Sequence, residues 1–168
     1  MAQPFYMTVS GESQGDLHPG ATDVDSLGNL SRSSHKDEIQ CQAFELDIAA
    51  PTDPQSGQPT GKRVHHGLKV TKVFDKSSPL LFQALAKSER ITEAAFNFYR
   101  TAPDGTEELY YVVTIKNATV IAIKGIQPNA LDPSNGPFLP MEEVTFAYKD
   151  IEWSHEVAST SGADSWED

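Results

Sequence analysis

The stretch from residue 61 to residue 85 changes its hydrophobic period partway, and this change constrains the fold more than any other feature of the chain. Its first half has apolar residues at alternate positions, which is typical of a strand with one buried face. These residues are Val64, Leu68, Val70 and Phe74, and His66 and Lys72 interrupt the same face. The sequence therefore predicts a strand that ends near Phe74.

A helix is predicted directly after this strand, over about residues 78–88. Ser78 is expected to be its N-cap, which accepts a hydrogen bond from a free backbone N–H, and Pro79 suits the first helical position. The β-branched Ile91 and Thr92 favour an end before them. We expect this to be the only helix. Since so short a helix is unstable alone in water, it is expected to pack over the open end or face of a β-structure. Its packing residues are Leu80, Leu81, Ala84 and Leu85.

Five further segments alternate as strands do: 4–10, 38–48, 91–100, 109–124 and 141–155. The turn Ala102-Pro103-Asp104-Gly105 predicts that 91–100 and 109–124 pair as an antiparallel hairpin. The apolar face changes parity within 38–48 and within 141–155, and 109–124 is expected to bend near Lys116-Asn117. Three bends in about six strands favour a coiled, nearly closed β-structure.

The connections are polar and rich in turn-forming residues. Residues 11–36 are predicted to be a long surface loop, in which His18 and His35 are interpreted as solvated. Residues 51–60 contain three prolines and are expected to form an extended loop exposed to solvent or to a partner. We divide the chain into one domain, 1–156, and a polar tail, 157–168, in which Trp166 is a candidate for docking.

Charge and composition exclude several classes of function. The net charge of -11 has the wrong sign for binding a phosphate backbone, so no nucleic-acid partner is expected. No stretch approaches the roughly 20 apolar residues of a membrane helix. The N-terminus has no basic start and contains Pro4, so no Sec signal peptide is expected. Cys41, the single cysteine, excludes an intramolecular disulfide and a cysteine-based zinc site.

Catalytic chemistry is not indicated. His65 and His66 are neighbours on a strand, point to opposite faces and cannot chelate one ion. The pairs Glu107-Glu108 and Glu142-Glu143 flank strands and are interpreted as solvated edges. Because the chain has no phosphate-binding loop, nucleophile elbow or zinc-protease motif, we expect no catalytic, metal or cofactor site and no enzyme activity.

Several segments together resemble one family. They are Thr60 to His65, Thr71 to Leu81, Phe98-Tyr99-Arg100 before the turn at Pro103, Val144 to Trp153, and Asp164-Ser165-Trp166. The chain resembles the haemolysin-coregulated protein (Hcp) family, which forms the tube of type VI secretion systems. The resemblance covers nearly the whole chain and is weakest in 11–36 and 127–140.

The resemblance implies a mainly β fold: a single-domain β-barrel of two packed, mostly antiparallel sheets with one short α-helix. It also implies a homo-oligomer, in which hexameric rings stack into a tube that a contractile sheath expels. Further implied partners are a spike protein at the tube tip and effector proteins carried in the channel. The protein would reside in the bacterial cytoplasm before firing and then be secreted without a Sec signal peptide.

Two sets of residues are candidates for the surfaces of such a ring. A ring needs two different, complementary patches on each copy. The candidate subunit-interface arm comprises Pro51, Asp53, Pro54, Gln55 and Pro59, and the candidate channel-lining residues are Glu45 and Asp47. Two other hypotheses are a monomeric β-barrel that binds a small ligand in its interior, and a hydrolase with its site in the long loops.

Overall fold

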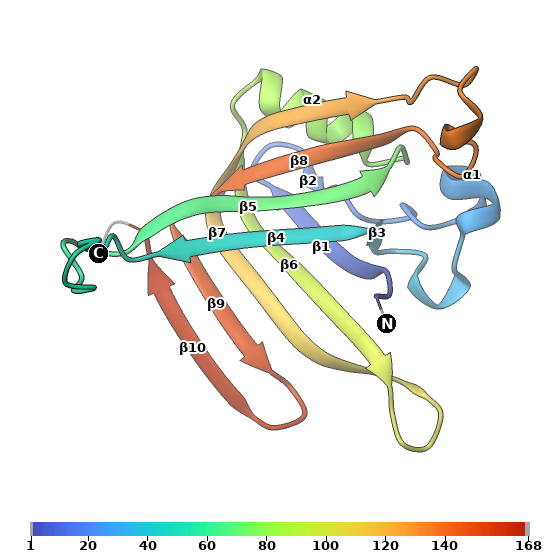
Figure 1. Cartoon of the computed structure of the whole chain (residues 1–168). Coiled ribbons are helices and arrows are strands. Elements are labelled where there is room, and N and C mark those ends of the chain that lie inside the picture. Colours follow the sequence, from blue (N-terminus) through green and yellow to red (C-terminus); the bar gives the residue numbers. More distant parts are fainter. Residues whose placement is uncertain (1, 167–168) are drawn as a thin grey trace.

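The chain folds into a coiled β-structure with one helix of substantial length, and the computed structural model describes residues 2–166 (Figure 1). The strands are β1 (Phe5–Gly11), β2 (Gly15–Asp16), β3 (Ile39–Cys41), β4 (Ala43–Ala49), β5 (Val64–Val73), β6 (Arg90–Thr101), β7 (Glu107–Ile126), β8 (Met141–Ala147), β9 (Asp150–His155) and β10 (Thr160–Ser165). The helices are α1 (Val24–Leu27) and α2 (Ser78–Ala86), with 3-10 turns at Gly28–Leu30, Ser33–His35 and Pro133–Asn135. All strand pairs are antiparallel.

One bent strand closes the barrel. The strands follow the order β2-β1-β6-β7-β8-β5-β4, with β4 and β1 near opposite ends of this order. Only Gln42 separates β3 from β4, yet β3 pairs with β1 and β4 pairs with β5. The backbone N–H of Gln42 donates to the Thr71 carbonyl at 2.7 Å. The parity change in residues 38–48 therefore marks the point at which the chain stops pairing with β1 and begins to pair with β5.

The longest strand, β7, belongs to both sheets. Its residues 111–116 pair with β9, and residues 119–126 pair with β8. Asn117 lies between these parts with a φ of 51°, which bends the strand at the predicted place. The partner segment breaks between β8 and β9 at residues 148 and 149. The bent strands thus join the two predicted sheets into one hydrogen-bonded network.

The strand β5 departs from the predicted alternation. Val64 and Phe74 were expected on the buried face, but they are 41% and 44% exposed, whereas His65 is buried. The pairing of β4 with β5 shifts register here, and Gly67 has a φ of 86°. The extra residue forms a β-bulge that exchanges the faces of the residues before it, Val64 and His65 among them, whereas Phe74 lies beyond the end of the strand at Val73. Counting alternate positions along the sequence cannot reveal this exchange of the buried and exposed faces.

The helix α2 lies against the barrel as predicted, with Leu81 and Ala84 fully buried. The expected N-cap is wrong by one residue, because Ser77 holds that position and its side chain makes no capping bond. The Ser78 hydroxyl instead accepts a hydrogen bond from the Asp75 backbone N–H at 3.0 Å. The four-residue helix α1 is a second helix that the sequence did not indicate.

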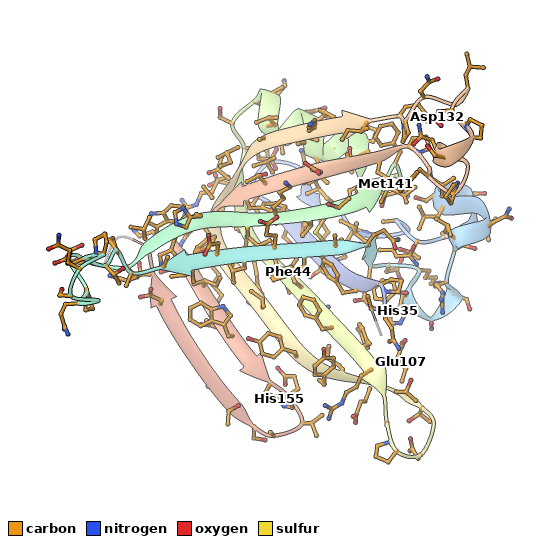
Figure 2. All side chains as sticks on the ribbon, viewed as in Figure 1. His35, Phe44, Glu107, Asp132, Met141 and His155 are labelled. Atoms are coloured by element: carbon orange, nitrogen blue, oxygen red, sulfur yellow. The ribbon has the colours of Figure 1, made fainter. Side chains whose placement is uncertain are left out.

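Residues 11–36 pack onto the barrel more tightly than a solvated loop would. His35 was interpreted as solvated, which is wrong, since only 6% of its surface is exposed. Its ring stacks on Tyr6 with centroids 3.9 Å apart. Its Nδ1 lies 3.0 Å from Glu38 Oε1 and its Nε2 lies 2.5 Å from Glu107 Oε1 (Figure 2). His35 therefore ties this excursion to β7.

The interior of the barrel is filled by side chains rather than hollow. The largest fully buried apolar side chains come from both sheets and from α2: Phe96, Phe146, Met7, Leu68, Leu81, Ile91, Ile115 and Ile151. Such a core follows from the inward faces of strands that coil around one another. Among residues 2–166, the structure contains no helix that is both long and apolar enough to span a membrane.

Candidate functional site

The predicted arm, residues 51–60, is an ordered hairpin that extends β4 and β5. Thr52 and Pro59 form a β-bridge, and Thr60 N–H donates to the Pro51 carbonyl at 2.8 Å. At the tip, the Asp53 carboxylate accepts hydrogen bonds from Gln55 N–H at 3.0 Å and from the Ser56 hydroxyl at 3.1 Å. These bonds, first that from Gln55, lower the pKa of Asp53. The arm therefore holds its shape by its own contacts.

The arm projects from the end of the molecule at which β4 ends and β5 begins (Figure 1). Pro51, Pro54, Gln55 and Pro59 are exposed, and Asp53 is half-buried. The backbone hydrogen bonds from Asp53 N–H to Gln58, from Gly57 N–H to Asp53 and from Thr60 N–H to Pro51 lie within the arm itself. The structure thus brings all five predicted arm residues together on one element that stands away from the core.

The predicted channel-lining residues lie on the outer face of β4. Glu45 and Asp47 are exposed and alternate with half-buried apolar residues. Together with residues of β5 and β8 they border a shallow hollow of about 160 Å³, lined also by His66, Gly67, Lys69 and Thr145. Lys69 Nζ and Glu143 Oε2 form an ion pair at 3.3 Å on the partly exposed surface. The face is polar and carries both signs of charge.

A cluster that the sequence did not predict joins the base of the arm to the C-terminal strand. We call it the C-terminal clasp, and its members are Arg63, His65, Tyr148, Asp164 and Trp166. Arg63 makes a bidentate pair with Asp164, at 2.9 and 2.8 Å, and donates to the Ser165 carbonyl at 2.7 Å. The Trp166 ring stacks on His65 with centroids 5.3 Å apart. Trp166 therefore docks, and β10 orders residues that were placed in the tail.

The surroundings of the clasp shift the pKa of two of its members, Asp164 and Tyr148. The bond from Arg63, followed by that from His65, holds the pKa of Asp164 well below its usual range. Burial, followed by the charge of Asp164, raises the pKa of Tyr148 to about 12, so its hydroxyl remains protonated. His65 Nδ1 lies 2.6 Å from this hydroxyl and Nε2 lies 2.9 Å from Asp164. Tyr148 can thus donate to Nδ1 while Nε2–H donates to Asp164.

A buried ionic network lies at the opposite end of β5. Lys72 Nζ is 2.9 Å from Asp75 Oδ1, 3.0 Å from the Ser78 hydroxyl and 2.5 Å from Glu142 Oε1. The side chains of Lys72, Asp75 and Glu142 are 0% exposed. The interpretation of Glu142 as a solvated edge residue is therefore wrong. The one sequence signal for this network was a lysine on an otherwise apolar strand face.

His65 and His66 lie on opposite sides of β5, as expected for neighbours on a strand, with His65 buried and His66 exposed. Within residues 2–166 no three potential ligands come together in a group that could hold a metal ion. The chemistry of the described surfaces is that of hydrogen bonding, ion pairing and proline packing. Such surfaces suit contacts between macromolecules.

Comparison with known proteins decides the family. A family model described as "Type VI secretion system effector, Hcp" matches residues 6–155. The chain belongs to the Hcp family. A major exported protein of Pseudomonas aeruginosa is 46% identical over 166 residues, which cover 99% of this chain and 96% of that protein. The resemblance noted in the sequence is thereby confirmed.

Solved structures agree with this membership. A crystal structure of an Hcp protein is 36% identical, covers 99% of both chains and superimposes with a TM-score of 0.93. The secreted protein Hcp3 from Pseudomonas aeruginosa is 37% identical, with a TM-score of 0.82 over 98% of this chain and 99% of that one. The mainly β Hcp fold is confirmed by these matches.

Membership of the Hcp family defines the general role of the chain. It is an Hcp protein of a type VI secretion system, and the Hcp family is one of secreted structural proteins rather than of enzymes. Assembly with other copies is consistent with the family. The function of such a protein lies in the surfaces that it offers to other proteins rather than in a catalytic site.

Proposed function

We propose that six copies of this Hcp protein form a ring around a channel, and that rings stack into the inner tube of the secretion system. A contractile sheath would expel this tube from the bacterial cytoplasm, with a spike protein at its tip and effector proteins in its channel. Family membership supports the general role. The observation that supports self-assembly is the arm.

The arm suits binding to a second copy because it is ordered before it meets a partner. Its hairpin bonds and the turn at Asp53 hold one conformation, although its residues are almost all exposed. An ordered loop loses little conformational entropy on binding, so more of its contact energy contributes to affinity. We expect the arm to meet a different patch on the next copy, and such a heterologous contact is the type of interface that generates rings.

Glu45 and Asp47 are proposed to face the channel. Both lie on an exposed, polar face of the sheet, and a wide aqueous channel requires such a face. Mixed charge from Lys69 and Glu143 nearby would give effector proteins a hydrated surface that binds them weakly. Weak binding suits cargo that must later be released.

The filled interior gives no support to a monomeric barrel that binds a small ligand inside. Fully buried side chains such as Phe96 and Phe146 occupy the space that a ligand would need. The hollows bordered by described residues lie at the surface and mix polar with apolar groups. The self-assembling structural protein is therefore the function that we retain.

Negative-stain electron microscopy of an arm variant tests this proposal. The variant carries Pro51→Ala, Pro54→Ala, Gln55→Ala and Pro59→Ala, all at exposed positions. Pro103→Ala in the exposed β6–β7 turn is the matched control. We expect rings with a central hole from the unchanged protein and from the control, and single particles from the arm variant. Rings that persist at the same frequency in the arm variant would remove the arm from the interface.

A further inference from the structure

The arm is joined to the barrel through an interruption of the β4–β5 ladder. Ala49 pairs with Val64, and pairing resumes in the arm where Thr60 N–H donates to the Pro51 carbonyl. Between them, one residue on the β4 side, at position 50, faces three on the β5 side, at positions 61–63. Among the described residues no ladder pairing joins position 50 to positions 61–63, and a two-stranded ribbon can change direction where its ladder is interrupted. Residues 50 and 61–63 therefore form a hinge between barrel and arm.

The C-terminal clasp holds one side of this hinge. Arg63 is a hinge residue, and its guanidinium meets Asp164 by two parallel bonds and the Ser165 carbonyl by a third. Bidentate pairs of this kind fix orientation as well as distance. Beyond the hinge, Nε2 of buried His65 lies 2.9 Å from Asp164 Oδ2, the oxygen that also accepts from Arg63 Nε, and the His65 ring stacks on Trp166. The C-terminal segment thus determines where the arm begins and in which plane.

The C-terminal segment is itself anchored to the barrel. All six residues of β10 pair with β9, and β9 pairs with β7. Trp166 N–H donates to the Lys149 carbonyl at 2.8 Å, and its ring meets Tyr148 with centroids 5.1 Å apart. The clasp therefore connects the base of the arm to β7, by way of β10 and β9. Its two sides, Arg63 and Asp164, lie about 100 positions apart in the sequence.

We propose that Asp164 and Trp166 are positioning residues, which act through Arg63 and His65 to hold the arm in the direction required to meet a second copy. This inference rests on the proposed function of the arm. Loss of the clasp would leave the barrel and the arm hairpin intact but would free the hinge. Only the fraction of copies whose arm points in the binding direction could then assemble. The apparent affinity between copies falls in proportion to that fraction.

Hydrogen exchange at the base of the arm measures how freely the hinge moves. The variants are Asp164→Asn and Trp166→Ala, with Asp164→Glu as the conservative change and Asp25→Asn as an exposed control at the far end of the molecule. Exchange is measured in the background of the arm variant above, so that a neighbouring copy cannot protect the arm. We expect exchange at the hinge and the residues that flank it, 49–50 and 61–65, to rise roughly tenfold in Asp164→Asn and Trp166→Ala, while residues 52–60 of the intact hairpin and the control stay unchanged. Asp164→Glu should recover part of the protection.

Assembly is measured by light scattering with each change in the otherwise unchanged protein. We expect the concentration at which half the chains assemble to rise roughly tenfold for Asp164→Asn and Trp166→Ala, with the same far-ultraviolet circular dichroism as the parent. Unchanged exchange at the hinge would overturn the role of the clasp while leaving the proposed function in place. A freed arm with unchanged assembly would overturn the role of the arm as an interface. A parent protein that never assembles would instead contradict the proposed function itself.

Discussion

At the scale of single residues, Lys72 is the least ordinary side chain of the molecule. It is fully buried, and its ammonium group lies between the carboxylates of Asp75 and Glu142. One oxygen of each carboxylate, Asp75 Oδ2 and Glu142 Oε2, has no hydrogen-bond partner. Removing the cation would leave two buried carboxylates without their common partner, which costs far more than losing a surface ion pair.

We therefore expect Lys72→Met to lower the free energy of unfolding by about 3–5 kcal/mol. The matched control is Lys69→Met on the same strand, where the partly exposed pair with Glu143 should contribute less than about 1 kcal/mol. Urea denaturation at fixed protein concentration measures both. Equal losses for the two variants would mean that the buried network does not stabilise the fold.

Asp164 gives a prediction about pH. Its folded-state pKa is lowered below the reference value of 3.8 by the bonds from Arg63 and His65. The stabilisation from Asp164 is therefore fully present above about pH 4, and is lost only as the pH falls below the unfolded value towards the lowered one. The difference in stability between the parent and Asp164→Asn, from denaturation at pH 7, 5 and 3, should hold between pH 7 and 5 and shrink at pH 3. A difference that grows towards acid would contradict this reasoning.

The sequence predicted individual residues well where their environment is set locally. The exposed arm residues, such as Pro54 and Gln55, follow from a proline-rich run without apolar anchors. His35 and Glu142 could not be placed, because their environments come from partners about 70 and 64 positions away, Glu107 and Ser78. Spacing along the chain says nothing about such contacts.

At the scale of elements, Gly67 sets the shape of β5. Its φ is 86°, and a Cβ there would lie 3.0 Å from the backbone oxygen of Phe146. We expect Gly67→Ala to destabilise the fold by roughly 1–3 kcal/mol, because both backbone strain and a close contact oppose it. Gly61→Ala is the matched control, since its Cβ would meet no atom within 4 Å. Thermal unfolding compares them, and equal melting temperatures would contradict the strain at the bulge.

The places where strands cross or bend could be predicted where the pattern of apolar residues along the strand changes. The crossing at Gln42 appears as a change of apolar face along the sequence, and the bend at Asn117 was expected because the segment 109–124 is too long for one flat strand and apolar on both faces. The bulge at Gly67 was missed because it exchanges faces within one apparently regular run. The strand β10 was missed as well, because TSGADS has no apolar alternation and takes its pairing from β9.

At the scale of the whole molecule, charge opposes the proposed assembly. Each chain carries a net charge of -11, so a ring of six concentrates six times that charge before any stacking. Salt screens such repulsion over a distance of about 10 Å at 0.1 M. We therefore expect rings to stack more readily as salt is added, which light scattering measures as growing particle length. Tubes that shorten as salt rises would show that attraction between charged groups, rather than repulsion, controls stacking.

The central claim is that this Hcp protein is a building block that joins copies of itself through an ordered arm. Size-exclusion chromatography with light scattering measures the mass of the assembly over a range of concentrations and ionic strengths. The account predicts a species of six times the 18.4 kDa chain mass, which the arm variant fails to form. A folded parent protein that elutes as a single 18.4 kDa chain under every condition would contradict the claim.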